Sequence, residues 1–485
     1  MKTETPGTET PGTDKTLRRL EPAAPAGVRP ESDRSRKDTQ RRVAPAAGAA
    51  GAATRLSLAS ELRMVADSLA QVLAGHHLPV DPGGPSTPEV SRAAVRDMAF
   101  AAVRDLGRVR ALLNLLNRRA PEPEVLALQA AALSQLLDGR RPPAVIVDQA
   151  VHAARSDPRT QAAAGLFNAV LRRFGREQES LLARVADDPQ ARWNFPPWWI
   201  EALSRAYPRD WQAVLELAGR PPPLTLRVNR RRVSVDAYRT RLLTEGLASD
   251  RIGDQALRLE RAVAVERLPG FAEGLVSVQD AGAQLAAQFL PVRDGQRVLD
   301  ACAAPGGKSA ALLERADVRL VCLDRDDDRL DRLRSDMRRL QLSPEKVITG
   351  DASVPASWWD GEPFDAILAD VPCSASGIVR RHPEIRWLRR RRDIATFASL
   401  QSQILAGLWP TLKPGGTLLY ATCSVFGAEG ADIIEAFLRA EPGARRMPLT
   451  VVFDGAPVPV EQLLPCSSSM REHDGFYYAL IEKLR

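Results

Sequence analysis

The sequence has few cysteines and no long apolar run. Five cysteines occur among 485 residues, and none belongs to a CxxC pair or to a cluster with histidine. An odd count without such motifs argues against a disulfide framework or a structural zinc site, and favours a reducing compartment. No apolar run approaches the ~18 residues of a membrane span, and the polar N-terminus lacks the apolar stretch of a signal peptide. We therefore predict a cytoplasmic protein without a metal site or a membrane segment.

The composition is typical of a globular protein with several domains. Hydrophobic residues make up 44% of the chain and charged residues 26%, and a chain of this length is expected to form roughly two to four domains. The net charge of +7 is compatible with a polyanionic partner, but an ordinary basic protein would have the same charge. Charge alone therefore leaves nucleic-acid binding open.

The N-terminal half predicts a tail followed by a helical domain. Residues 1–52 contain a duplicated ETPGT, a basic RSRKDTQRR and an Ala/Pro/Gly-rich stretch. Such a segment buries too little apolar surface to offset its ordering entropy, so we predict disorder. Its basic patch would either touch RNA or belong to a passive tail. Residues 53–190 have apolar residues at i, i+3, i+4 and i+7 spacing, which predicts an all-α bundle.

The C-terminal half predicts two further domains. Residues 191–285 combine short helical segments with short strands, which indicates a small α+β module. From 286 to 485 apolar strands alternate with helices, as in VRLVCLDRDDDRLDRLRSDMRRL. This alternation predicts an α/β fold with a doubly wound parallel sheet. Ligands of such sheets bind beyond the carboxyl ends of the strands.

The glycine-rich segment CAAPGGKS at 302–309 predicts a nucleoside-binding turn. A phosphate-binding P-loop is the competing interpretation, but it requires glycine where Cys302 stands, and Pro305 lacks a backbone N–H. Two adjacent glycines instead allow close approach of a ligand to the backbone at a helix start. Asp324 ends the next strand and could accept both ribose hydroxyls, while Asp351 after the third strand could face an adenine amino group. Both carboxylates could alternatively serve as simple strand-end caps.

Six segments carry a resemblance to a known family. In order they are DACAAPGGK, LDRDDDRL, GDAS, ADVPCSASGIVRRHPEIRWLRR, KPGGTLLYATCS and HDGFYYALIEKL. They resemble the motifs of S-adenosylmethionine-dependent RNA cytosine-C5 methyltransferases, in particular the RsmB/Fmu (Sun) branch, which methylates small-subunit ribosomal RNA. The helical segment LFNAVLRRF (166–174) is similar to the NusB-like RNA-binding domain of this branch. The resemblance implies a class I methyltransferase fold, Rossmann-like, preceded by a NusB-like bundle and a connecting module.

The resemblance also implies roles for two of the cysteines. Cytosine C5 is a poor nucleophile, and addition of a thiolate at C6 activates it as an enamine, which is covalent catalysis. By the family's pattern Cys423 is the nucleophile, Cys373 assists release of the product, and Asp370 faces N3 of the base. A thiol pair that only packs at two strand ends is the alternative. The residues implied to bind S-adenosylmethionine are Cys302, Ala303, Ala304, Pro305, Gly306, Gly307, Lys308, Asp324, Asp351 and Asp370.

An arginine-rich segment follows the first of these cysteines. Residues 378–393 contain seven arginines and two acidic residues, which is suited to holding RNA phosphates, while a Trp or Arg side chain could stack on an unpaired base. A solvated basic helix is the alternative. The residues expected to contact RNA are Arg380, Arg381, Trp387, Arg389 and Arg390. The segment NRRRV at 229–233 is a second candidate.

These observations together predict a monomeric RNA cytosine-C5 methyltransferase that uses S-adenosylmethionine and acts on small-subunit (16S) rRNA. Attack at C6 requires an unstacked base, so the substrate is expected to be single-stranded RNA or a flipped-out cytosine. A tRNA cytosine-C5 methyltransferase would share the same core motifs. A non-catalytic RNA-binding factor, for antitermination or assembly, would not need the two cysteine motifs.

Overall fold

The computed structural model describes residues 55–485, except residues 80, 85, 454–455 and 469–470. The tail predicted to be disordered, residues 1–52, lies outside the described residues. Within the described part of the chain, no helix is both long and apolar enough to cross a membrane.

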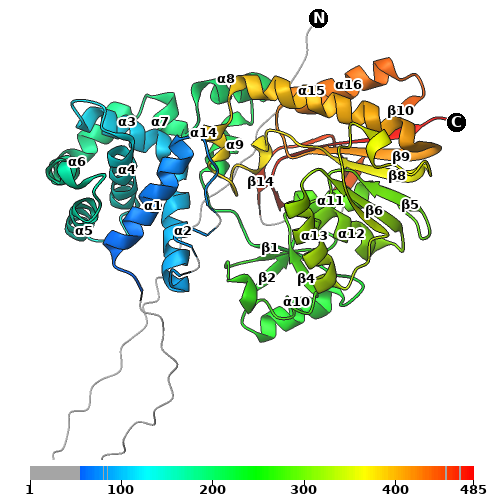
Figure 1. The fold of residues 1–485 in the computed structure, drawn as a ribbon, viewed down its shortest axis with the longest axis horizontal. Helices are drawn as coiled ribbons and strands as arrows, with labels where there is room; N and C mark the ends of the chain where they lie inside the picture. Colours follow the sequence, from blue (N-terminus) through cyan, green and yellow to red (C-terminus); the bar gives the residue numbers. More distant parts are fainter. Residues whose placement is uncertain (1–54, 80, 85, 454–455, 469–470) are drawn as a thin grey trace, which may run out of the picture. The chain divides into compact units, whose positions relative to one another are not determined.

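Six helices form a bundle around α4 (Figure 1). Helix α4 contacts each of the other five, and every residue from Ala127 to Leu136 is buried. Its small alanines allow the neighbouring helices to approach closely, so this helix is buried around its whole circumference. The helices are α1 (Leu58–Leu73), α2 (Glu89–Arg104), α3 (Leu106–Leu116), α4 (Pro123–Asp138), α5 (Pro143–Arg155) and α6 (Ala164–Val185).

Three short helices follow the bundle and form an aromatic cluster. They are α7 (Pro189–Trp193), α8 (Pro197–Ala206) and α9 (Trp211–Ala218). Trp199 is buried, and its ring centroid lies 5.1 Å from that of Phe426. The Tyr207 hydroxyl donates a hydrogen bond to the Val425 carbonyl at 2.8 Å. These helices therefore pack on the segment after Cys423 and have a core separate from that of the small sheet described next.

The small module is a four-stranded antiparallel sheet with strand order β2-β3-β1-β4. Helix α10 (Val235–Thr244) packs on it through Tyr238 and Leu242, which are fully buried in the module's core. The strands are β1 (Thr225–Val228), β2 (Ser249–Arg251), β3 (Ala256–Leu259) and β4 (Val276–Val278).

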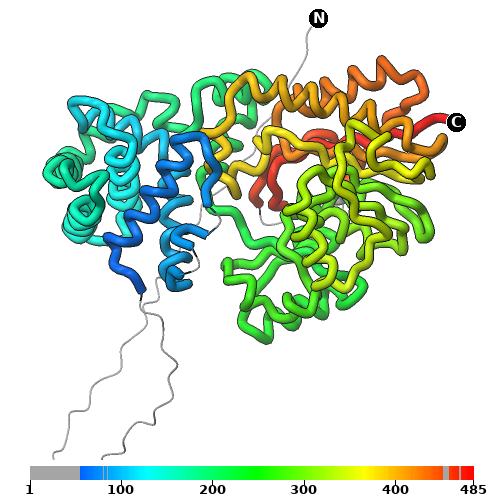
Figure 2. Tube along the Cα trace, in the orientation of Figure 1, coloured from blue at the N-terminus to red at the C-terminus, as the bar shows by residue number. Residues whose placement is uncertain are grey.

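The C-terminal domain is built on a mixed sheet with strand order β10-β16-β9-β8-β5-β6-β7. Five neighbouring strands, from β9 to β7, are parallel, whereas β16 pairs antiparallel with both of its neighbours, β9 and β10. Figure 2 shows the red last strand β16 beside β9. The strands are β5 (Arg297–Asp300), β6 (Arg319–Asp324), β7 (Lys346–Thr349), β8 (Phe364–Asp370), β9 (Leu412–Thr422), β10 (Ala444–Met447) and β16 (Phe476–Lys483).

Helices cover both faces of this sheet. One face packs against α11 (Ala281–Phe289), α12 (Gly307–Arg315) and α13 (Asp327–Leu340), and the other against α15 (Arg391–Leu408) and α16 (Ala431–Ala440). This arrangement confirms the predicted α/β class and its order after a helical bundle and a small α+β module. The reversed strand β16 was not predicted, because the alternation of strands and helices does not encode the direction of the last strands. Shorter strands precede the last one: β11 (Thr450–Phe453), β12 (Ala456–Pro459), β13 (Gln462–Leu463), β14 (Cys466–Ser467) and β15 (Glu472–His473).

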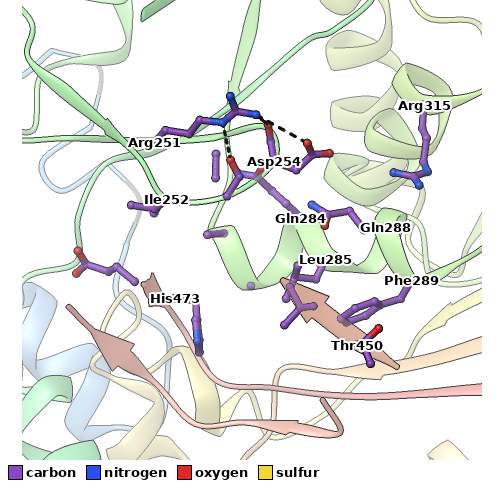
Figure 3. Close-up of a pocket in the computed structure, with 16 residues that line it drawn as sticks. Arg251, Ile252, Asp254, Gln284, Leu285, Gln288, Phe289, Arg315, Thr450 and His473 are labelled. Atoms are coloured by element: carbon purple, nitrogen blue, oxygen red, sulfur yellow. Dashed lines mark hydrogen bonds and ion pairs between the residues drawn. The ribbon is translucent and has the colours of Figure 1, made fainter. Parts of the chain in front are cut away.

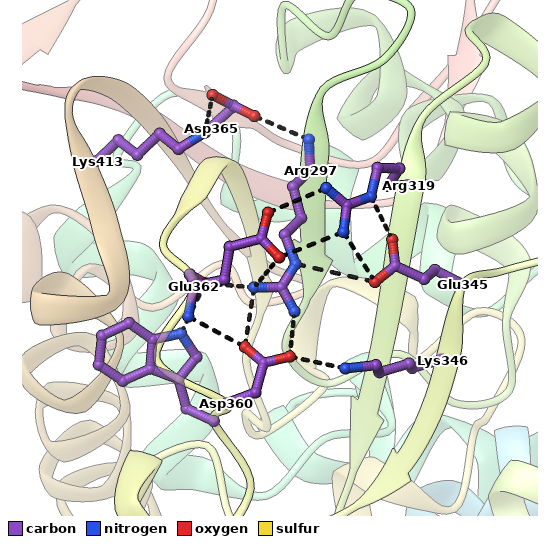
Figure 4. A network of polar contacts seen from close by, with 9 residues as sticks. Arg297, Arg319, Glu345, Lys346, Asp360, Glu362, Asp365 and Lys413 are labelled. Atoms are coloured by element: carbon purple, nitrogen blue, oxygen red, sulfur yellow. Dashed lines mark hydrogen bonds and ion pairs between the residues drawn. The ribbon is translucent and has the colours of Figure 1, made fainter.

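An ion-pair network joins the amino ends of the parallel strands (Figure 4). Arg297, which begins β5, lies 2.6 Å from the Asp360 carboxylate, and Lys346 of β7 lies 2.7 Å from the same carboxylate. The hydrogen bonds from Arg297 and Lys346 lower the pKa of Asp360. Lys413 of β9 pairs with Asp365 of β8 at 2.7 Å. These charges stabilise the edge opposite the carboxyl ends and leave those ends free for a ligand.

Candidate active site

The residues predicted to carry function lie at the carboxyl ends of neighbouring parallel strands. Strand β8 ends at Asp370 and strand β9 at Thr422, and Asp370 pairs with Ala421 in the ladder. Cys373 follows the first strand by three residues, and Cys423 follows the second directly. The parallel register therefore brings two positions 50 residues apart in the sequence to one edge of the sheet.

The two thiols face each other. The Cys373 and Cys423 sulfur atoms are 3.4 Å apart, within hydrogen-bond distance, and both cysteines are free and half-buried. The hydrogen bond with Cys423 and burial raise the pKa of the Cys373 thiol. A raised pKa keeps a thiol protonated near neutral pH, so Cys373 is suited to donate a proton or hydrogen bond rather than to attack.

A lysine and a carboxylate accompany the thiols. Lys308 Nζ lies 2.6 Å from Asp370 Oδ2, and both side chains are largely buried. Burial lowers the pKa of Lys308, but the Asp370 carboxylate outweighs burial, and negative charge on Cys423 adds to its effect, so the net pKa lies above its ordinary value. The Lys308 ammonium also lies 5.7 Å from the ring centroid of Phe476. A charged pair therefore stands beside Cys423 at the end of β8.

The glycine-rich segment forms a tight turn into α12. Gly306 has φ of 105°, and a Cβ at this position would lie 2.9 Å from Leu333, so glycine is required there. Asp324 is 4% exposed and accepts hydrogen bonds from the backbone N–H of Ala304 at 3.0 Å and of Asp326 at 3.1 Å. The Asp324 carboxylate thus ties the end of β6 to the glycine-rich turn.

Three of the predicted cofactor residues line one small cavity. Cys302, Asp324 and Asp351 line a space of about 80 Å³ at the ends of β5, β6 and β7, and Pro372 and Ile404 also form part of its wall. Asp351 accepts hydrogen bonds from the Ser353 hydroxyl and backbone N–H, which lower its pKa and keep it ionised. Arg325 and Arg329 also line the cavity. The two carboxylates accept hydrogen bonds and the apolar side chains can pack on a base, which suits a nucleoside, since its sugar hydroxyls and amino group are donors.

The sequence analysis missed the buried residues that hold the glycine-rich turn in place. Asp300 is fully buried, accepts a hydrogen bond from the Ser309 hydroxyl at 2.6 Å, and has its pKa raised to about 7 by burial. Arg227 of the small module pairs with Glu314 at 2.8 Å and donates to the Gly307 carbonyl at 2.6 Å. These contacts join segments 9 to 87 residues apart, so no local pattern indicates them.

Sequence reasoning also missed a buried acid behind the thiols. Glu429 is fully buried and accepts hydrogen bonds from Ser374 and Ser424. Each of these serines directly follows one of the two cysteines. The repeated Cys-Ser pair was therefore the one sequence signal that could have indicated a common partner.

The first arginines of the segment 378–393 have partners within the protein. Arg380 lies 2.8 Å from the Glu472 carboxylate and is 7% exposed. Arg381 lies 2.8 Å from Asp280 and 2.5 Å from Asp474. These ion pairs tie the loop after Cys373 to the small strand β15 and to the start of α11.

The rest of this segment is divided between contacts and solvent. The Trp387 indole N–H donates to the Val103 carbonyl in the helical bundle at 2.9 Å, and Arg389 donates to the Ser374 carbonyl at 3.0 Å. Arg390 is exposed, whereas the other four residues expected to contact RNA are buried or half-buried. The RNA contacts of all five residues stay predictions, and Arg390 is the most exposed of the five.

A larger cavity lies elsewhere in the same half of the chain (Figure 3). It has a volume of about 530 Å³ and is lined by Arg251 and Asp254 from the small module, by Gln284 and Phe289 of α11, and by His473. None of the residues predicted to bind cofactor or to catalyse lies in its wall, so it is separate from the thiol site.

Family models match three consecutive parts of the chain. Residues 287–482 match a model described as 16S rRNA methyltransferase RsmB/F. Residues 195–266 match the ferredoxin-like domain of RsmF/B-like methyltransferases, and residues 80–176 match the NusB family. The order of these models is the order of the bundle, the small module and the mixed-sheet domain.

Named relatives cover most of the chain. A Pseudomonas putida protein called ribosomal RNA small subunit methyltransferase B is 43% identical over 403 residues, which are 82% of this chain and 91% of that protein. A Vibrio cholerae protein of the same name is 40% identical over 399 residues, 81% of this chain and 89% of that protein. The crystal structure of a methyltransferase homolog from Pyrococcus horikoshii is 26% identical with a TM-score of 0.52, and the match covers 61% of this chain and 98% of that one. With this identity over nearly the full length of its relatives, the chain belongs to the 16S rRNA methyltransferase RsmB/F family.

Proposed function

We propose that this protein transfers a methyl group from S-adenosylmethionine to C5 of a cytosine in small-subunit ribosomal RNA, through a covalent bond between Cys423 and C6. The observation that carries the proposal is the thiol pair at 3.4 Å beside the Lys308–Asp370 pair. Membership of a family named for 16S rRNA methylation supports the RNA substrate. A binding factor without catalysis would need neither the second thiol nor the buried lysine.

The residues around the small cavity fit the proposed methyl donor. Asp324 would accept hydrogen bonds from ribose hydroxyls, because each carboxylate oxygen has a second lone pair beyond its bond to the backbone N–H of Ala304 or Asp326. Asp351 would accept from the adenine amino group, and the turn at Gly306 and Gly307 would approach the ligand closely. S-adenosylmethionine, when bound, supplies an electrophilic methyl group.

The nucleophile in this proposal is Cys423. Its thiolate adds to C6 and forms the sulfur–carbon bond, while the C5=C6 electron pair moves through C4 toward N3. Lys308 and Asp370, 2.6 Å apart, hold a proton near the position where this negative charge develops, and such a preorganised group stabilises the adduct. The activated C5 would then form a bond to the methyl group, while the bond from that methyl group to the donor's sulfur would break and the donor would leave as a neutral thioether.

The second thiol serves release. After methylation the C5 proton leaves as a base takes it, the C5=C6 double bond re-forms, and the bond from C6 to the Cys423 sulfur breaks with its electrons on sulfur. The Cys373 thiol lies within hydrogen-bond distance of that sulfur and stays protonated because of its raised pKa. It can therefore donate to the departing thiolate and make it a better leaving group.

Two cysteine variants test this mechanism. Cys423→Ala should lose methylation and form no covalent RNA complex. Cys373→Ala should still attack, but release slowly and accumulate a denaturant-resistant protein–RNA species on a gel. A trapped complex with Cys423→Ala and none with Cys373→Ala would reverse the two roles. Full turnover in both variants would refute the covalent mechanism.

The substrate is tested separately. Bisulfite sequencing of rRNA and tRNA from a deletion strain should show one or more 5-methylcytosines missing from small-subunit rRNA only. A position missing from tRNA instead would favour the tRNA enzyme that shares these motifs, and an unchanged pattern in both would favour a binding factor.

A further inference from the structure

A single buried carboxylate joins the two loops that carry the thiols. Glu429 ends the short 3₁₀ turn Gly427–Glu429 and is 0% exposed. Its Oε1 accepts the backbone N–H of Ser374 at 2.6 Å, and its Oε2 accepts the hydroxyls of Ser374 at 2.5 Å and of Ser424 at 2.7 Å. Because Ser374 follows Cys373 and Ser424 follows Cys423, the residues that this carboxylate holds are the immediate neighbours of the two thiols in the chain.

Further hydrogen bonds hold Glu429 and the two thiol loops in place. Gln401 of α15 donates to the Pro372 carbonyl at 2.9 Å and to Glu429 Oε1 at 3.4 Å. The Tyr420 hydroxyl donates to the Glu429 carbonyl at 3.0 Å. The backbone N–H of Gly377 bonds the Cys423 carbonyl at 2.9 Å. The acid is thus fixed from β9, from α15 and from both thiol loops.

The charge of Glu429 has no cationic partner. Among the described residues no ion pair includes it, and the hydrogen bonds that satisfy it come from a backbone amide, two hydroxyls and an amide side chain. A buried carboxylate without a counter-charge is expensive, so a packing role alone would be served better by an apolar or neutral residue. What a carboxylate adds is two oxygens that only accept hydrogen bonds. That is the property required where three donors converge from two loops.

We propose that Glu429 is a positioning residue that sets the separation of the two catalytic sulfurs by clamping the loop after β8 to the loop after β9. The catalytic role of the two sulfurs rests on the proposed function, whereas the hydrogen bonds of Glu429 to the two loops do not depend on it. The negative charge of Glu429, after the Cys423 hydrogen bond and burial, also raises the pKa of Cys373. Glu429 therefore favours the protonated form of the Cys373 thiol. Lys308, in contrast, interacts electrostatically with a negative charge on Cys423.

The separation of the sulfurs can be measured without RNA or cofactor. Diamide oxidises two adjacent thiols to a disulfide: each sulfur loses its proton and one electron, the sulfur–sulfur bond forms, and the azo group of diamide is reduced to a hydrazine. Because the Cys373 and Cys423 sulfurs lie 3.4 Å apart, the full-length protein should form this disulfide rapidly. Peptide mapping by mass spectrometry without reductant identifies the pair among the five cysteines.

Glu429→Gln is the decisive variant. The glutamine amide nitrogen is itself a hydrogen-bond donor and would replace one of the two oxygens that accept from Ser374 and Ser424. At least one of these bonds would be lost, so the two loops should separate. We expect disulfide formation at least about tenfold slower, with methylation turnover reduced and cofactor affinity unchanged. Ser424→Ala removes one of the three bonds and should slow the reaction by a smaller factor, which keeps the test valid if Glu429→Gln folds poorly. Glu384→Gln is the matched control, since Glu384 is 3% exposed, contacts His77, and touches neither serine.

The outcomes separate this inference from the proposed function. Disulfide formation at the wild-type rate in both folded Glu429→Gln and Ser424→Ala would overturn the clamp, whatever happens to methylation, because Ser424→Ala keeps the Glu429 charge that raises the pKa of Cys373. Equal slowing in Glu384→Gln would also overturn it, because the effect would then be general loosening. Slow disulfide formation in Glu429→Gln together with no methylation of any rRNA by the wild type would support the clamp and refute the proposed function.

Discussion

Replacement of Arg227 tests how the small module supports the candidate cofactor turn. Arg227 of β1 is 1% exposed, and its guanidinium makes two bonds to Glu314, at 2.8 and 2.9 Å. Its third nitrogen donates to the Gly307 carbonyl at 2.6 Å and to the Gln279 amide oxygen at 2.5 Å. One side chain thus bridges two domains directly beneath the start of α12.

The expected cost follows from burial. Arg227→Met would leave the Glu314 carboxylate, whose side chain is 1% exposed, as an unpaired buried charge, and breaking a buried ion pair in this way costs about 3–5 kcal/mol. The Gly307 carbonyl would lose a charged donor, which adds about 1–3 kcal/mol. We expect the free energy of unfolding to fall by about 4 kcal/mol or more. Combining Arg227→Met with Glu314→Leu removes both charges and should restore most of that loss.

Chemical denaturation followed by tryptophan fluorescence measures stability, and calorimetric titration measures affinity for S-adenosylmethionine. In the double variant stability should recover while cofactor affinity stays reduced, because the Gly307 carbonyl still lacks its donor. A loss below about 1 kcal/mol in Arg227→Met, or losses in the double variant equal to the sum of the singles, would refute the reasoning, since coupled residues must deviate from additivity.

Three further predictions concern the same domain. Asp324→Ala should weaken S-adenosylmethionine binding by about 1–3 kcal/mol in calorimetric titration, and unchanged affinity in a folded variant would remove Asp324 from the site. Joint replacement of Arg390 and Arg392 by alanine should reduce the salt dependence of RNA binding by roughly one unit of slope for each phosphate that is no longer neutralised. Arg381→Ala should instead mainly lower the melting temperature. An unaltered slope would show that Arg390 and Arg392 face solvent and do not bind RNA phosphates. Burial raises the pKa of Asp300 to about 7. The folded protein therefore keeps a proton that the unfolded chain releases above pH ~4. The contribution of this group to the free energy of unfolding should fall by about 3 kcal/mol between pH ~5 and pH ~8. Asp300→Asn should remove that part of the pH dependence in denaturation curves, and an identical curve for the variant would contradict the assignment.

Some of the site could be predicted because its residues stand at the ends of apolar strands. The runs that end at Asp324 and Asp370, and the one before Cys423, are visible in the sequence, and a parallel sheet brings such ends to one edge. The same argument predicted the α/β class. The reversed direction of β16 was not predictable, because a strand's direction depends on which edge remains open when it is added.

The arginine-rich segment shows the limit of local patterns. Seven arginines between residues 378 and 393 indicate a surface, since most arginines are exposed. In the structure Arg386 is fully buried and donates to the Ala218 carbonyl, and Arg381 pairs with Asp474 and Asp280. These partners lie between 93 and 168 residues away in the chain, so composition cannot distinguish a buried arginine from an exposed one.

The order of the domains, the class of the sheet and the two cysteines at neighbouring strand ends follow from the amino-acid sequence, because hydrophobic periodicity and strand termini are local properties. Only the tertiary structure shows that the two thiols lie 3.4 Å apart, that Lys308 pairs with Asp370, and that Glu429 joins both thiol loops. These contacts depend on the register of β8 against β9 and on hydrogen-bond partners distant in the chain. Such partners are selected by the packed fold as a whole, since a buried polar group must find its donor or acceptor wherever the fold places one.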